Sequence, residues 1–124
     1  MPPTTSFSGS AEALRAALVA AMQRLEREGL NRGAAGNASV RYGDGLLITP
    51  TGVLPGDLDA RMIVALDVDG TPREHDYLPS SEWRFHVAIY AARPEAGAVV
   101  HVHSPYATAL ACARREIPPF HYMV

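Results

Sequence analysis

Lysine is absent from this chain of 124 residues, so all 11 basic residues are arginines. A covalent Schiff-base mechanism requires a lysine amine, and that route is therefore closed within the chain. Cysteine is almost absent as well, since Cys112 is the single one. One thiol cannot form an internal disulfide, which agrees with a reducing compartment.

Long apolar runs and an excess of positive charge are also missing. No apolar run approaches the roughly 20 residues that a membrane-spanning helix needs. The opening stretch, MPPTTSFSGS, lacks the charged start and apolar segment of a signal peptide, so we expect a cytoplasmic protein. The net charge of −2 provides no basic stripe for nucleic acid. We therefore expect neither a membrane nor a nucleic acid as partner.

The composition does provide a hydrophobic core, because 48% of the residues are hydrophobic and only 19% are charged. The length fits one domain, which we place over residues 1–124. Its first predicted element is a helix that begins at Ser10, the expected N-cap, and stops at Gly29. The apolar residues that recur at helical spacing along it are Leu14, Leu18, Met22 and Leu25.

Short strands and turns follow this helix. ASVRY and LLIT are predicted to be two strands joined by GDG, a strong hairpin signal. A short helical piece around residues 57–61 is expected to lead to a strand in MIVALD. Antiparallel hairpins mixed with helices indicate an α/β fold whose central, mainly antiparallel sheet is covered by helices.

A second substantial helix is predicted in the stretch LPSSEWRFHVAIYAARP. Ser80 or Ser81 would cap it, Glu82 would lie in its first turn, and Pro94 would end it. The side chains expected to face the core are those of Trp83, Phe85, Val87 and Ile89.

The last part of the chain is expected to hold three elements. AGAVVHVHS is predicted as a strand, and PYATALACARR as a third helix that opens with Pro105. PPFHYMV would begin another strand, yet it ends without a turn or a polar tail. This apolar terminus either pairs within an oligomer or belongs to a truncated domain.

Two histidines stand two residues apart in the predicted strand AGAVVHVHS. Residues i and i+2 of a strand project from one face with Cα atoms roughly 6.5 Å apart, so the rings of His101 and His103 can converge on one ion. Neutral imidazole is a standard zinc ligand, and a catalytic zinc takes three protein ligands. Such a pair alone is a weak indication, and two unrelated histidines on a polar strand face are the alternative.

The stretch PSSEW adds a possible third ligand and a possible anion site. Ser80 and Ser81 lie at the expected helix N-terminus, where free N–H groups and the helix dipole favour an anion such as phosphate. Glu82 could be a metal ligand or a proton-transfer base. The loops GNAS and TPTG could also bring backbone amides close to a phosphate. Taken singly, each stretch is more simply an ordinary helix cap or turn.

The order of these stretches resembles a known family. GNASVRYGDGLLITPTG, LPSSEWRFH, AVVHVHS and IPPFHYM resemble the class II aldolase/adducin family, above all its L-fuculose-1-phosphate aldolase branch. The likeness runs in register from about Leu14 to the last residue. It implies a class II aldolase-like fold in which His101 and His103 are two of three zinc-binding histidines. It also implies that Glu82 ligates the resting metal and then acts as the base.

The same resemblance assigns two further roles. Tyr122 matches a tyrosine that reaches a neighbouring subunit's site and serves there as a proton donor. The positions that match the family's phosphate-binding residues are Asn37, Thr51, Gly52, Ser80 and Ser81.

The resemblance further implies a zinc-dependent aldolase with one zinc per subunit. It would cleave a ketose 1-phosphate such as L-fuculose 1-phosphate to dihydroxyacetone phosphate and an aldehyde, in a homo-oligomer that is a tetramer by resemblance. Zinc chelated by the substrate's oxygens would stabilise an enediolate as a Lewis acid, so the missing lysine is not needed. A sister epimerase or dehydratase on the same scaffold, and a non-catalytic adducin-like assembly module, are the alternatives.

The resemblance also leaves a gap in the metal site. The family's third zinc-binding histidine lies beyond Val124, and none of His75, His86 and His121 occupies its motif. His86 follows Glu82 by one helical turn, and a packing or surface role is expected for it rather than metal binding. We therefore expect the N-terminal part of a longer enzyme, with the C-terminal part of the domain missing and the metal site incomplete.

Overall fold

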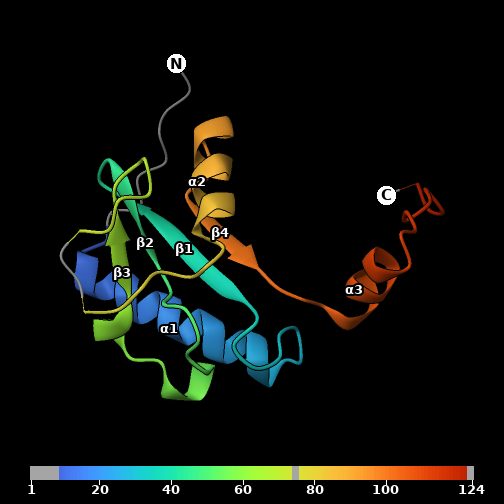
Figure 1. The fold of residues 1–124 in the computed structure, drawn as a ribbon, viewed down its shortest axis with the longest axis horizontal. Helices are drawn as coiled ribbons and strands as arrows, with labels where there is room; N and C mark the ends of the chain where they lie inside the picture. The colour runs from blue at the N-terminus through green and yellow to red at the C-terminus, as the bar shows by residue number, and fades with distance from the viewer. Residues whose placement is uncertain (1–8, 74–75, 123–124) are drawn as a thin grey trace.

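The computed structural model describes residues 9–73 and 76–122 of the chain. Within these ranges three helices and four strands follow one another in the order helix, three strands, helix, strand, helix (Figure 1). The helices are α1 (Ala11–Arg27), α2 (Trp83–Ala92) and α3 (Pro105–Cys112), and the 3-10 turns are η1 (Pro55–Asp57) and η2 (Ala60–Met62). The strands are β1 (Asn37–Tyr42), β2 (Gly45–Ile48), β3 (Val64–Leu66) and β4 (Ala98–His101).

The four strands form one antiparallel sheet in the order β3-β2-β1-β4. The predicted hairpin joins β1 to β2, with Tyr42 opposite Gly45 and a two-residue turn between them. Gly43 in this turn has a φ of 59°, a conformation that favours glycine. The predicted α/β fold with a central antiparallel sheet is therefore confirmed.

Helix α1 covers one face of the sheet, as its apolar spacing predicts. Ser10 caps it, because the Ser10 Oγ accepts a hydrogen bond from the Ala13 N–H at 3.2 Å. Gly29, just past its end, has a φ of 70°. The buried residues that form this half of the core are Leu14, Leu18, Met22, Ala38, Val40, Leu47, Leu58 and Ile63.

Helix α2 covers the opposite face of the sheet, but the side chains that it turns toward the sheet differ from those predicted. Phe85 and Ile89 are 58% and 40% exposed, whereas His86 and Tyr90 are buried. Trp83 and Val87 do pack against the core, as expected. The prediction for Phe85 and Ile89 was wrong because His86 and Tyr90 find hydrogen-bond partners on the sheet, which offsets the cost of burying them.

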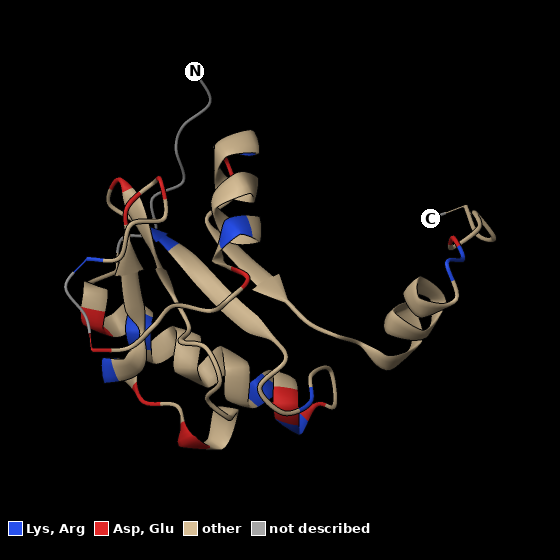
Figure 2. Cartoon of the chain, in the orientation of Figure 1, with Lys and Arg blue, Asp and Glu red and all other residues tan. Residues whose placement is uncertain are grey.

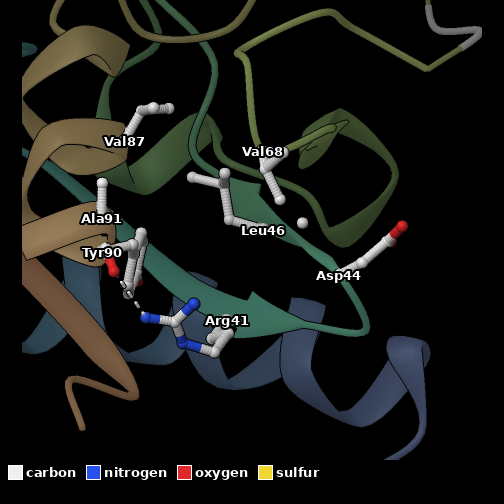
Figure 3. Close-up of a pocket in the computed structure, with 8 residues that line it drawn as sticks. Arg41, Asp44, Leu46, Val68, Val87, Tyr90 and Ala91 are labelled. Carbon is white, nitrogen blue, oxygen red and sulfur yellow. Dashed lines mark hydrogen bonds between the residues drawn. The ribbon is translucent and has the colours of Figure 1, made fainter. Parts of the chain in front are cut away.

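Arg41 of β1 ties the sheet to the end of α2. Its Nη2 donates to the Tyr90 carbonyl at 3.1 Å (Figure 3), and its Nε donates to the Ala96 carbonyl at 3.1 Å. The guanidinium also lies 4.7 Å from the centre of the Tyr90 ring. These contacts fix the position of Tyr90 between α2 and β1.

Three other sequence predictions differ from the structure. Glu82 occupies the N-cap position of α2, so it does not lie in the first turn and neither serine caps the helix. The Ser80 Oγ instead accepts the Glu82 N–H at 3.2 Å. The helical piece around residues 57–61 is replaced by the two 3-10 turns.

The third difference concerns the end of the chain. Residues 118–122 form no strand, and residues 123–124 lie outside the described part. A strand requires a hydrogen-bonded neighbour, and the described strands provide none for this segment. β4 leads out of the sheet to α3, which lies apart from α1 and α2 (Figure 1).

Helix α3 is confirmed in position but has an unusual surface. It begins at Pro105, as predicted, and contains no buried residue. It also contains no charged residue, whereas both signs of charge occur on α1 and on the loops around the sheet (Figure 2). None of the helices in the described ranges combines the length and apolar character needed to cross a membrane.

Candidate active site

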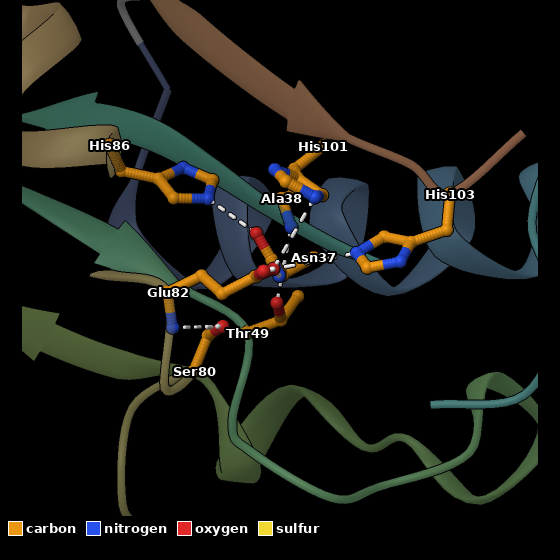
Figure 4. Close-up of polar contacts among 8 residues, drawn as sticks. All are labelled: Asn37, Ala38, Thr49, Ser80, Glu82, His86, His101 and His103. Atoms are coloured by element: carbon orange, nitrogen blue, oxygen red, sulfur yellow. Dashed lines mark hydrogen bonds and ion pairs between the residues drawn. The ribbon is translucent and has the colours of Figure 1, made fainter. Parts of the chain in front are cut away.

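Three of the predicted site residues converge beside the N-terminus of α2 (Figure 4). The Nε2 of His101 lies 3.5 Å from the Glu82 Oε2, and the Nε2 of His103 lies 3.8 Å from the Glu82 Oε1. One ligand atom from each of the three residues lies within 4.8 Å of the other two. The carboxylate and both imidazoles can therefore meet at a single ion.

This donor set fits a zinc ion. Imidazole nitrogens and a carboxylate oxygen are the ligands of many catalytic zinc sites. At ligand distances of about 2.0–2.1 Å, neighbouring ligand atoms in a tetrahedral site lie roughly 3.3 Å apart. His101 and His103 lie 3.5 and 3.8 Å from different oxygens of the carboxylate, and one ligand atom from each of the three residues lies within 4.8 Å of the others. The three side chains would therefore move closer together to hold one ion.

The site is open on the side of His103. An open hollow of about 520 Å³ is lined by residues that include His101, His103, Ser104 and Thr108. The His103 side chain is 46% exposed, whereas that of Glu82 is 27% exposed. Small molecules can therefore approach the two imidazoles from solvent, whereas the less exposed carboxylate lies deeper in the site.

The sheet and α2 together place His101. Asn37 of β1 is its cross-strand partner, which brings the β4 histidine next to the amide that contacts Glu82. The His101 ring lies 5.9 Å from the ring of Phe85, with an angle of 24° between the planes. Phe85, expected in the core, therefore flanks the candidate metal site.

His103 reaches the site by a different route from the one predicted. β4 ends at His101, so His103 belongs to the extended segment after the strand and not to the strand face. The two rings still face each other, with centres 4.9 Å apart and planes tilted by 47°. The predicted convergence of the two imidazoles is therefore present, although strand geometry is not its cause.

A chain of hydrogen bonds connects Glu82 to the core. The Asn37 Nδ2 donates to the Glu82 Oε2 at 2.7 Å, and the Asn37 Oδ1 lies 2.5 Å from the His86 Nε2. The His86 Nδ1 lies 2.6 Å from the Ser39 Oγ, which lies 2.8 Å from the Tyr90 hydroxyl. The carboxylate is thus attached to the sheet through a continuous polar chain.

Sequence reasoning missed Ser39 and Tyr90 in this chain and left His86 as a packing residue. A signal was present: Asn37 and Ser39 alternate along β1, and His86 and Tyr90 are four residues apart on α2. Burial lowers the pKa of His86 to about 4, with a further lowering by His101 and an opposing effect of Glu82. Its ring is therefore neutral at neutral pH.

His86 does not serve as the third histidine ligand. Both of its ring nitrogens have hydrogen-bond partners, and its side chain is fully buried. His75 lies outside the described residues. His121 belongs to the segment after α3, where its ring packs against that of Tyr122 at 4.4 Å.

The residues predicted to bind phosphate lie on two adjoining loops and on β1. The loops are paired, because the Thr51 N–H donates to the Leu78 carbonyl at 3.1 Å and the Ser80 N–H donates to the Thr49 carbonyl at 2.9 Å. Ser80 contacts Glu82 through the hydroxyl that accepts its N–H (Figure 4). The two loops and the candidate metal site therefore share one region of the surface.

These residues differ in exposure. Asn37 and Ser80 are buried and hydrogen-bonded to Glu82, whereas Thr51, Gly52 and Ser81 are exposed. Gly52 has a φ of 71°, and no atom lies within 4 Å of where a Cβ would be. The exposed members of the set can thus contact a small molecule directly.

Tyr122 does not join the triad. It lies in the segment beyond α3, its side chain is 90% exposed, and its ring packs against His121. Its role at a neighbouring subunit's site stays a prediction.

Comparison with known proteins places this geometry in a family. The profile described as "Class II Aldolase and Adducin N-terminal domain" matches residues 16–124. A 5-methylthioribulose-1-phosphate/5-deoxyribulose-1-phosphate aldolase from Rhodospirillum rubrum is 55% identical over 119 residues, which cover 94% of this chain and 52% of the relative. An L-fuculose phosphate aldolase from Escherichia coli is 53% identical over 100 residues, which cover 81% and 46% of the two chains.

A solved structure agrees with these sequence matches. The structure of an L-fuculose 1-phosphate aldolase has a TM-score of 0.85 and 35% identity to this chain, and the match covers 93% of this chain and 57% of that one. The chain thus spans about half the length of the curated relatives it matches. On its sequence, its fold and the place of its motifs, the chain belongs to the class II aldolase/adducin family.

Proposed function

We propose that the protein is a zinc-dependent aldolase that cleaves a ketose 1-phosphate, such as L-fuculose 1-phosphate, to dihydroxyacetone phosphate and an aldehyde. The observation that carries the proposal is the meeting of Glu82, His101 and His103 beside the paired loops that hold Thr51 and Ser80. The names of the two relatives differ in the sugar but share a phosphorylated ketose. The shared phosphate end is the part of the substrate that these loops would hold.

Glu82, His101 and His103 would hold one zinc per subunit, with a further histidine supplied from beyond residue 124. When bound, the ion supplies Lewis-acid polarisation of the substrate's carbonyl and hydroxyl oxygens. The two imidazoles have no proton-transfer role in this proposal. They direct their Nε2 atoms toward the carboxylate and thereby define where an ion would lie.

Glu82 would carry the proton. Cleavage breaks the carbon–carbon bond beside the keto fragment: the hydroxyl on the departing carbon loses its proton as that carbon becomes the aldehyde, and the electron pair left on the three-carbon product takes up a proton. The reverse reaction removes a proton from that carbon and returns one to the aldehyde oxygen. A carboxylate is suited to both steps because it accepts and returns a proton without a covalent bond to the substrate. The Asn37 amide holds one carboxylate oxygen, which would keep the other directed toward the open side near His103.

The phosphate would bind at Asn37, Thr51, Gly52, Ser80 and Ser81. Thr51 and Ser81 offer exposed hydroxyls, and the N-terminal end of α2 adds a partial positive charge. Ser80 and Asn37 both contact Glu82, so they would connect the bound phosphate to the carboxylate. Such anchoring would hold the reacting carbons at a constant distance from the base.

The remaining parts of the proposal concern the assembly. Tyr122 would donate a proton at the site of a neighbouring subunit in a homo-oligomer, a tetramer by family resemblance, in the cytoplasm. Its exposed position beyond α3 is compatible with contact to another subunit. The sister epimerase and dehydratase activities would use the same metal and phosphate groups, whereas an assembly module would need neither.

Retro-aldol turnover by the full-length protein tests the proposal. Turnover should stop when a chelator removes the metal and return when zinc is restored. Glu82→Gln should lower turnover by about 10²- to 10⁴-fold, the range that a positioned acid–base group contributes, while phosphate binding persists. Glu26→Gln on the exposed side of α1 is the matched control. Activity that survives complete zinc removal, or undiminished turnover of Glu82→Gln, would contradict the proposal.

A further inference from the structure

We propose that His86, Ser39 and Tyr90 form a buried hydrogen-bond relay that holds the Asn37 amide in the orientation that donates to Glu82. In this role His86 is a positioning residue for the carboxylate at the candidate metal site. The functional meaning of the relay rests on the proposed function, because it concerns Glu82 as ligand and base. The direction of its hydrogen bonds does not depend on that function.

The end of the relay at Glu82 sets the orientation of the amide. An ionised carboxylate only accepts hydrogen bonds, so the Asn37 atom that lies 2.7 Å from the Glu82 Oε2 must be the Nδ2 donor. The other amide atom, Oδ1, then faces His86 at 2.5 Å and must accept. His86 therefore carries its proton on Nε2.

The same reasoning continues through the histidine ring to Tyr90. A neutral ring with its proton on Nε2 has an acceptor at Nδ1, so the Ser39 hydroxyl donates to it across 2.6 Å. A hydroxyl has one proton, so the Ser39 oxygen accepts the hydrogen bond from the Tyr90 hydroxyl at 2.8 Å. All donors then point in one direction, from Tyr90 toward Glu82.

Because the relay is buried, only this arrangement gives each of its hydrogen-bonding groups a partner. The exposed fractions of His86, Ser39, Asn37 and Tyr90 are 0%, 1%, 4% and 7%, so water has little access to replace a lost partner. Moving the His86 proton to Nδ1 would leave Nε2 unprotonated, so two hydrogen-bond acceptors, Nε2 and the Asn37 oxygen, would face each other. Flipping the amide to relieve that contact would put its oxygen against the carboxylate, which costs the free energy of an unmade buried hydrogen bond.

The relay matters to the metal site because it acts on one particular carboxylate oxygen. Oε2 accepts the Asn37 hydrogen bond and also lies 3.5 Å from the His101 Nε2, whereas Oε1 faces His103 at 3.8 Å. Fixing Oε2 thus decides which oxygen faces which histidine. Hydrogen-bond partners of metal ligands commonly change metal affinity by about 10- to 100-fold when they are removed.

Four variants of the full-length protein separate the relay from simple packing. His86→Leu removes both hydrogen bonds, whereas His86→Gln keeps an N–H donor near the position of Nε2. Ser39→Ala removes the donor to Nδ1 but keeps the Asn37 contact at Nε2, and Tyr90→Phe removes only the far end of the relay. Val87→Ala on the same helix is the control, since it reduces core packing without touching the relay.

The first measurement is the tautomer of His86 in the metal-free protein, read from ¹⁵N imidazole resonances. We expect the Nε2–H form in the wild type, in Tyr90→Phe and in Ser39→Ala, because the Asn37 oxygen still faces Nε2 in each. An Nδ1–H ring in the wild type, or loss of the Nε2–H form in Ser39→Ala, would overturn the proposed direction of the relay. This readout needs neither metal nor substrate and remains available if His86→Leu does not fold.

The second measurement is zinc affinity, by competition with a chelator. His86→Leu should bind zinc more weakly, by up to the roughly 10- to 100-fold that loss of a ligand's own hydrogen-bond partner costs, and His86→Gln and Val87→Ala should stay near the wild type. Equal affinities of His86→Leu and His86→Gln would contradict the positioning role. A wild type that binds no zinc but holds the Nε2–H tautomer would instead reject the proposed function and support the direction of the relay.

Discussion

Glu82 is the residue on which the proposed chemistry depends, because three side chains meet at its carboxylate. Asn37 donates to one oxygen, and His101 and His103 approach the two oxygens from the open side. Its backbone N–H is held by the Ser80 hydroxyl, so the start of α2 cannot rotate freely. The position of the carboxylate is therefore set by β1, by the loop before α2 and by the core.

A second single residue, His86, should make the stability of the protein depend on pH. Its pKa in the folded chain is about 4, below the ordinary value of 6.5, because burial and nearby His101 disfavour the charged ring more than Glu82 favours it. Below pH 6.5 the unfolded chain binds a proton that the folded chain does not. The free energy of unfolding should therefore be fully retained above pH 6.5 and decrease as the pH falls toward 4.

Denaturant unfolding of the wild type and of His86→Gln at pH 7 and pH 5 checks this expectation. Glutamine does not titrate, so the variant should lose less stability between the two pH values than the wild type. Ser39 and Asn37, the side chains that bond to the ring, carry no charge in this range. The same loss in both proteins would show that His86 is not the group responsible.

The residues of the triad could be predicted, whereas most of the relay could not. His101, His103 and Glu82 stand in short stretches whose residue types and order indicate metal chemistry. Ser39 and Tyr90 have only the strand and helix spacing that places them beside Asn37 and His86, and their contact depends on β1 lying under α2. The apolar Phe85 and Ile89 were expected inside because hydrophobicity alone does not reveal that His86 and Tyr90 have partners on the sheet.

The β1–β2 hairpin packs closely against β3 where β2 begins. Gly45 begins β2, and a Cβ at this position would lie 2.1 Å from the carbonyl oxygen of Leu66 in β3. Leu66 is paired with Leu46, the next residue of β2, so β3 cannot move away without losing its pairing. Glycine is required here by the close approach of two backbones.

Gly45→Ala should therefore destabilise the protein by about 1–3 kcal/mol, the usual cost of forcing an extra group into a packed site. Gly56→Ala is the matched control, because no atom lies within 4 Å of its added Cβ. Urea unfolding of the two variants gives the comparison directly. A loss at position 45 no larger than that at position 56 would contradict the account of the hairpin.

Elements with local signals were predicted well, and those that need distant partners were not. Ser10 and Gly29 mark the ends of α1, and GDG marks the hairpin, because caps and tight turns depend on neighbouring residues. The cap of α2 was misplaced because Ser80 bonds to Glu82 while its own N–H pairs with Thr49, far away in sequence. The strand expected at residues 118–122 would need a partner strand in the same way.

For the whole molecule, the candidate metal site lies at the border of an uncovered apolar surface. Val100 on β4 is 54% exposed and Tyr106 on α3 is 89% exposed, while α3 has no buried residue. The hollow next to His101 and His103 extends over α3 to Ala107 and Ala111. The proposed continuation of the domain beyond residue 124 would cover this surface and bring the third histidine to the site.

Zinc content and zinc affinity of the full-length protein test whether Glu82, His101 and His103 hold a metal ion. His101→Ala and His103→Ala should be compared with the wild type and with His121→Ala, a histidine outside the triad. We expect about one zinc per subunit in the wild type and in His121→Ala, and loss of the bound metal in both triad variants. A wild type without zinc after purification with the metal, or triad variants that bind it as tightly, would contradict the account.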